Sequence, residues 1–144
     1  MVHWARVLEN AERVAALANA NIKVVRLFAI FHDARRVNDQ RDPGHGARGG
    51  ALARSMRARL DVTPEELDML EYACAHHTDG DVHADPTIQA CWDGDRLDLP
   101  RVGIRVKPHF LSPFAGDAAI IAWAHERAVR PHTPEFVTSW RVTA

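Results

Sequence analysis

The chain has 144 residues, of which 47% are apolar and 26% charged, and its formal net charge is −1. This length suits one hydrophobic core, so we expect a single domain over residues 1–144, and the ordinary composition argues against a disordered or collagen-like chain. Binding to a nucleic-acid backbone needs clustered Lys and Arg, and without a basic excess we expect no large nucleic acid as partner.

The N-terminus and the apolar segments predict a cytoplasmic protein without a membrane association. The first residues, MVHWAR, do not form the apolar region of a secretory signal. The longest apolar stretch, Ile22 to Phe31, contains Lys23 and Arg26. It is also much shorter than the ~20 residues that a bilayer requires. This stretch is therefore predicted to be a buried helix.

The first half of the chain shows the spacing of three helices. Val7, Val14 and Leu17 recur at helical spacing in a first helix from His3 to Ala20. From Ile22 to about Val37 the chain is apolar almost all round, as expected of a central helix. The turn formers of residues 38–46 (NDQRDPGHG) then predict a loop, and a third helix is expected over residues 47–60. Gly49 and Gly50 near its start would permit close helix packing.

Two clear helix starts follow in the second half. Thr63 can cap a helix, Pro64 suits its first turn and Glu66 completes a capping box, so a helix is predicted from there to about His77. Asp85 and Pro86 open another helix by the same logic. Residues 100–113 contain three prolines and are expected to be extended or irregular, and a last helix is expected over 116–129. Because strand-like alternation is missing, we predict an all-α, single-domain bundle of about five to seven helices.

Nine histidines are an excess for a domain of this size, and polar residues occupy places where helical patterns call for apolar ones. His32 and Asp33 close an apolar helix, while His77 and Asp95 each end an apolar stripe. His3 lies one turn before Val7 on the buried face of the first helix. A buried carboxylate is costly unless it is paired, hydrogen-bonded or bound to a metal. Imidazole and carboxylate ligands suit iron, manganese, nickel, cobalt or zinc, and the lack of cysteine ligands argues against a structural zinc cage.

In this order the residues resemble the HD-domain superfamily of metal-dependent phosphohydrolases. His3 followed four residues later by Val7 is similar to the first-helix motif of that superfamily, and Phe31-His32-Asp33 is similar to its name-giving doublet. Residues 93–98 (DGDRLD) resemble the late motif that supplies the last metal-binding Asp. His45 and the pair His76-His77 resemble the extra histidines of the subgroup with two metals. The resemblance covers about residues 3–98.

The resemblance implies one or two divalent transition metal ions and a phosphohydrolase that uses a metal-bound water. The first ion would be held by His3, His32, Asp33 and Asp95, and the second by Asp33, His45, His76 and His77. Asp33 would bridge the two ions, and Arg36 would hold a phosphate of the substrate. The implied substrate is a small phosphorylated metabolite or a nucleotide.

Several alternatives stay open at the level of sequence. The interval from His32 to His45 is short for the two-metal subgroup, so a mononuclear site remains an alternative. Arg35, Arg36 and Arg41 also fit an ordinary solvated charge cluster. Relatives in the superfamily include di-iron oxygenases, and a non-catalytic nucleotide-binding regulatory module is a third possibility. The native metal, the substrate and the oligomeric state are not determined, and a homo-oligomer is compatible with the sequence.

Overall fold

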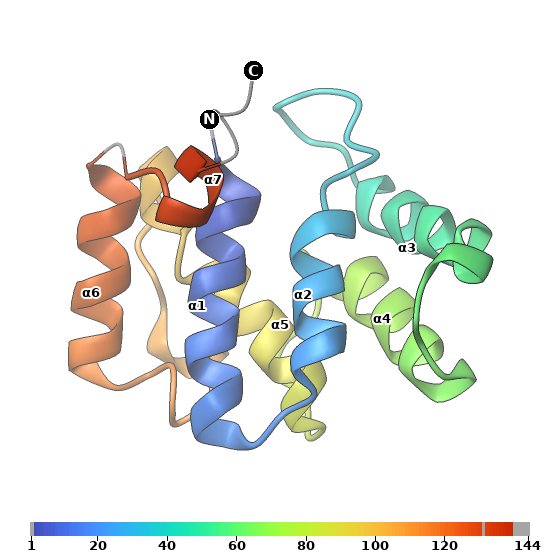
Figure 1. Ribbon diagram of the computed structural model, residues 1–144. Helices are drawn as coiled ribbons and strands as arrows, with labels where there is room; N and C mark the ends of the chain where they lie inside the picture. The colour runs from blue at the N-terminus through green and yellow to red at the C-terminus, as the bar shows by residue number, and fades with distance from the viewer. Residues whose placement is uncertain (1, 131, 140–144) are drawn as a thin grey trace.

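A computed structural model describes residues 2–130 and 132–139. Within these ranges the chain forms seven α-helices and three short 3-10 helices and no strand (Figure 1). The α-helices are α1 (His3–Ala18), α2 (Ile22–Phe31), α3 (His45–Ser55), α4 (Pro64–His76), α5 (Pro86–Arg96), α6 (Ala118–Val129) and α7 (Glu135–Ser139). The 3-10 helices are η1 (Arg57–Arg59), η2 (Leu99–Val102) and η3 (Pro108–Phe110). The predicted all-α bundle of about five to seven helices is confirmed.

Side-chain caps begin four of the helices where the sequence signals them. The Thr63 side chain accepts from the Glu66 amide while Glu66 accepts from the Thr63 amide, which completes the capping box at the start of α4. Asp85 caps α5, Asp117 caps α6 and Asn21 caps α2. Among the helices of the described ranges, none is both long enough and apolar enough to cross a membrane.

Several element boundaries differ from the sequence-based expectation: α1 ends at Ala18 and not at Ala20, α3 ends at Ser55 and not at residue 60, and α6 begins at Ala118 and not at residue 116. Two further differences lie next to the site residues. α2 ends at Phe31 instead of near Val37, and Val37 is 74% exposed, so extending the helix would bury no apolar surface there. α3 begins at His45, two residues before the expected start, and His45 is therefore a helix residue and not a loop residue. The Asp42 carboxylate accepts from the Val37 amide and from Arg48. These bonds fold the loop between the two helices back onto the start of α3.

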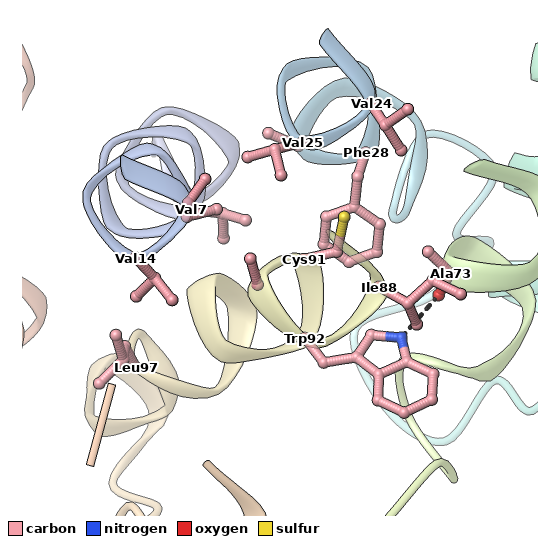
Figure 2. Close-up of a cluster of buried hydrophobic side chains, with 14 of the residues drawn as sticks. Val7, Val14, Val24, Val25, Phe28, Ala73, Ile88, Cys91, Trp92 and Leu97 are labelled. Atoms are coloured by element: carbon pink, nitrogen blue, oxygen red, sulfur yellow. Dashed lines mark hydrogen bonds between the residues drawn. The ribbon is translucent and has the colours of Figure 1, made fainter. Parts of the chain in front are cut away.

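The core lies between α1, α2, α4 and α5 (Figure 2). Phe28 of α2 is fully buried, as is Leu97 just after α5. Trp92 of α5 is 2% exposed, and its indole N–H donates to the Ala73 carbonyl of α4 at 3.0 Å. This bond gives the buried indole nitrogen a partner and joins α5 to α4.

Glycines set the spacing of two helix contacts that matter for the site. A methyl group at Gly46 would overlap the Cys74 carbonyl of α4, and one at Gly49 would overlap the Phe31 carbonyl at the end of α2. Only a glycine therefore lets α3 approach both neighbours this closely. As a result, His45 at the start of α3 lies beside His77 at the end of α4.

The first turn of α1 is held by tertiary contacts, because its N-cap, Val2, provides no side-chain cap. The Arg6 guanidinium donates to Asp98 at 2.8 Å and to the His132 carbonyl at 3.2 Å. Trp4 lies edge to face with Phe136 of α7, with ring centroids 5.9 Å apart. The short helix α7, which the sequence analysis did not predict, thus covers the N-terminal turn of α1 that carries His3 (Figure 1).

Candidate metal centre

Six of the side chains singled out in the sequence form two adjacent groups of potential metal ligands. The first group is His3, His32 and Asp95, and the second is Asp33, His45 and His77. In each group one ligand atom of every residue lies within 4.8 Å of the others. Five helices or helix ends supply these residues, so the site forms where the ends of α1 to α5 meet.

The first group joins the start of α1 to the ends of α2 and α5. The Nε2 atom of His3 lies 3.2 Å from Asp95 Oδ1 and 3.3 Å from Nε2 of His32. The His32 Nε2 atom is 3.7 Å from the same Asp95 oxygen. His32 has no exposed surface, and its ring stacks on Phe28 with centroids 4.8 Å apart.

The second group joins the end of α2, the start of α3 and the end of α4. His45 Nε2 lies 3.0 Å from His77 Nε2 and 3.1 Å from Asp33 Oδ1. His77 Nε2 is 3.6 Å from that same oxygen. Both histidines are buried, whereas the Asp33 side chain is 26% exposed, so the group is open to solvent on the side of Asp33.

Asp33 faces both groups with different oxygens. Its Oδ1 is directed at His45 and His77, while Oδ2 lies 3.7 Å from His3 Nε2 and 3.9 Å from His32 Nε2. One carboxylate is therefore in position to serve two cations at the same time. The bridging of two ions by Asp33, which the HD resemblance implies, stays a prediction.

All four histidines are oriented by a hydrogen bond at the ring nitrogen that points away from the site. His3 Nδ1 donates to the Asp98 carboxylate at 2.7 Å, and His77 Nδ1 donates to the Cys74 carbonyl at 2.7 Å. His45 Nδ1 meets the Asp42 carbonyl at 2.5 Å, and His32 Nδ1 meets the Phe28 carbonyl at 3.0 Å. Because a carbonyl or carboxylate can only accept, the proton of each neutral ring sits on Nδ1. The Nε2 lone pairs are then directed at the site, as in histidines that bind metals.

The ionisation of the site shows that it attracts positive charge. Burial lowers the pKa of His32 to about 4, against the pull of the Asp95 and Asp33 charges. Burial also opposes charge on His3 and His77, but carboxylate contacts outweigh it and raise their pKa values: Asp95 and Asp98 act on His3, and Asp33 and Asp95 act on His77. The pKa values of Asp33 and Asp95 are well below the usual range despite burial, because histidines surround both carboxyls.

These residues fit a divalent cation. Two facing Nε2 lone pairs repel unless a proton or a cation lies between them, and the neighbouring carboxylates raise the pKa values of His3 and His77, so they favour positive charge at these places. Nitrogen and carboxylate oxygen without thiolate ligands suit iron, manganese, nickel, cobalt or zinc, as the sequence analysis expected. The buried groups could therefore hold metal ions.

Two of the predicted site residues, His76 and Arg36, do not belong to either ligand group. His76 does not join either group: it is one residue before His77 on α4, about 100° around the helix axis. Its side chain is 47% exposed and lies next to Asp79 and the Tyr72 ring. The Arg36 side chain is exposed to solvent and lies behind His45, with Nη1 3.3 Å from Nδ1, the ring nitrogen that points away from the ligand group.

Sequence reasoning did not identify the residues that orient the ligands. Asp98 is 1% exposed and accepts from both His3 and Arg6, and Asp42 holds His45 through its carbonyl. Asp98 could have been found as the last acidic residue of the segment DGDRLD, since it lies one helical turn after Asp95. The backbone carbonyls that hold His32, His45 and His77 leave no signal in the sequence.

Comparison of the chain with protein-family models, with curated proteins and with solved structures gave no match. The resemblance to HD-domain proteins therefore rests on the sequence motifs alone. Function has to be argued from the site itself.

Proposed function

We propose that this protein is a metal-dependent phosphohydrolase that acts on a small phosphorylated metabolite or nucleotide. The observation that carries the proposal is the convergence of four imidazole Nε2 atoms on two carboxylates, with each Nδ1 atom held by an acceptor. A structural role alone would not require four oriented histidines around one shared carboxylate.

In this proposal the two groups hold two divalent transition metal ions. His3, His32 and Asp95 would hold one, His45 and His77 the other, and Asp33 would bind both. Such ions lower the pKa of a coordinated water and neutralise charge on phosphoryl oxygens. The chain's own contribution is to fix the two positions rigidly, since the ligands come from helix ends that are packed into one core.

Two arginines lie close to the ligand residues and would favour an anionic substrate. Arg36 lies beside His45 of the second group, and Arg101 lies beside the first group, where its Nη1 is 3.7 Å from Asp98 Oδ2. Arginine binds phosphate with paired hydrogen bonds. Because Arg36 is exposed and lies only three residues after Asp33, we propose that its side chain turns toward the site and binds the phosphate.

The test combines metal analysis with a substrate screen. Protein purified without chelator should contain close to two metal ions per chain and should release phosphate from some members of a panel of nucleotides and phosphorylated metabolites. The Asp33→Ala variant should lose both the metal and the activity, because the shared ligand is gone. Full activity of that variant would contradict the proposal, and turnover that requires oxygen would point to the oxygenase chemistry of related proteins instead.

The neighbouring histidines of α4 provide a matched pair of variants. His77→Ala should lower the metal content from two ions toward one, because it removes a ligand of the second group. His76→Ala, one residue away, should leave the metal content unchanged, because its exposed side chain faces Tyr72 and Asp79. Equal losses in the two variants would mean that the second group is not a metal site.

A further inference from the structure

A separate cavity of about 340 Å³ lies on another side of α5. Its lining includes Val14 and Ala18 of α1, Asp93 of α5, and Leu111 and Phe114 of the segment that precedes α6. This volume is at the small end of the range for small-molecule sites. The cavity is distinct from the metal centre, because none of its lining residues belongs to the two ligand groups.

The walls of the cavity are mostly apolar, and its rim is exposed; the polar lining residues are His83, Gln89, Asp93 and Ser112. Val14 and Leu111 are 1% and 7% exposed, whereas Val82 and Phe114 at the rim are 54% and 43% exposed. Contact between this apolar surface and an apolar ligand is favourable in free energy, because water is displaced from both surfaces. The two rim side chains are also the ones with the most freedom to move aside.

One polar group in the lining lacks a partner. Asp93 has no exposed surface, and its Oδ1 accepts from Gln89 Nε2 at 2.8 Å and from the Ser112 amide at 3.1 Å. Its Oδ2 is buried and accepts no hydrogen bond from the described residues. A buried carboxylate oxygen without a donor is costly, so a donor from outside the chain would be bound favourably.

The nearest cation along the helix does not fill this role. Arg96, three residues after Asp93, donates to the carbonyls of Asp81, Phe110 and Gly80. Gln89 has likewise used both of its N–H groups, on Asp93 Oδ1 and on the Phe110 carbonyl. Asp93 Oδ2 is thus left without a donor in a residue that lines the cavity, and burial raises the pKa of this carboxyl, which a bound cation would offset.

We propose that this cavity binds a small primary amine with an aromatic or branched apolar body. The ammonium group would donate to Asp93 Oδ2, and the apolar body would lie against Val14, Leu111 and Phe114. Because Asp93 Oδ2 is buried, the side chains around it have to move before the amine can reach it. The proposal is independent of the phosphohydrolase function, because Asp93 and the ligand Asp95 lie on nearly opposite faces of α5, about 160° apart around the helix axis.

Benzylamine is a suitable probe, with benzyl alcohol as its uncharged counterpart. Titration of the full-length protein, followed by NMR of labelled Val and Leu methyl groups, should show saturable shifts at Val14 and Leu111. We expect the alcohol to bind at least tenfold more weakly than the amine. Equal affinities for the two probes, or shifts that appear elsewhere only, would overturn the proposal.

Three variants locate the interaction. Asp93→Asn replaces the free oxygen by an N–H donor, so benzylamine should bind at least tenfold more weakly while benzyl alcohol does not. Asp79→Asn makes the same change of charge at an exposed position outside the cavity and should have no effect. Ala18→Phe should fill the cavity and abolish binding of both probes. Should Asp93→Asn fail to fold, unchanged benzylamine binding to Ala18→Phe would still refute the proposal.

Discussion

At the scale of single residues, the orientation of the histidines depends on acceptors that are not themselves ligands. Asp98 is the only carboxylate among these four acceptors, and it binds His3 and Arg6 from inside the protein. It fixes the tautomer of His3, and it holds the first turn of α1 in place through Arg6. The affinity of the first group for a metal should therefore depend on Asp98 although it does not face the site.

We expect Asp98→Asn to weaken metal binding at the first group by about 10- to 100-fold, the usual effect of losing such an outer partner. The amide cannot accept from His3 and Arg6 as a carboxylate does, and it carries no charge. Metal titration of the chelator-treated variant measures the loss. Asp117→Asn is the control, because Asn caps a helix as well as Asp does. Equal affinities in the two variants would contradict the proposed role of Asp98.

Metal affinity should also depend on pH in a defined direction. The pKa values of His3 and His77 are raised above 6.5, so at pH 6 each carries a proton on Nε2 that a metal has to displace. Affinity should rise with pH by up to about tenfold per unit for each proton released, until both histidines are neutral. Asp33 and Asp95 have lowered pKa values and stay ionised over this range. Competition titrations with Zn²⁺ between about pH 5.5 and 8.5 measure this, and a flat profile would contradict it.

At the scale of helices, the site depends on how closely α3 approaches its neighbours. The sequence shows that residues 44, 46, 49 and 50 are glycines, and close packing was expected near Gly49 and Gly50. The structure adds that Gly46 lies against the Cys74 carbonyl, next to the His77 ring. Two positions of one helix, Gly46 and Gly49, thus set the separation of the ligands in the second group.

We expect Gly46→Ala to destabilise the protein by about 1 to 3 kcal/mol, because the added methyl group overlaps backbone and the helices have to move apart. The second group should lose its metal before the first, since His45 moves with α3. Urea unfolding and metal analysis measure the two effects. Gly44→Ala is the matched control, because its methyl group would meet only the flexible end of Arg48. Equal stability of both variants would contradict the close approach.

Most helix starts carry a signal in the sequence, whereas the loop between α2 and α3 does not. Thr63, Asp85 and Asp117 mark their helices through side-chain bonds to amides two or three residues away, which a sequence displays directly. The end of α2 and the start of α3 depend on Asp42, whose bonds reach Val37 and Arg48 across a loop. The extension of α2 to Val37 and the loop position of His45 were therefore wrong.

At the scale of the whole molecule, bound metal would link α1, α2, α3, α4 and α5. A ligand that binds only the folded state stabilises it, by about 2.7 kcal/mol when its concentration is 100 times the Kd. Removal of metal by a chelator should lower the melting temperature. Hydrogen exchange should become faster in the first turn of α1, where His3 links that helix to α5. The Asp33→Ala variant should show no response to chelator, and an equal shift in both proteins would mean that the chelator acts elsewhere.

By itself the sequence determined the helical class, most helix starts and the residues that can bind a metal, because each of these depends on neighbours within about one helical turn. It also indicated the HD resemblance, although the phosphohydrolase function, the cytoplasmic location and the bridging of two metals stay predictions. Only the tertiary structure decided that His77 and not His76 joins the site, that Asp33 faces both groups and that Asp98 orients His3. Those facts depend on contacts between residues such as His3 and Asp95, which are distant in the chain and meet only when the helices pack.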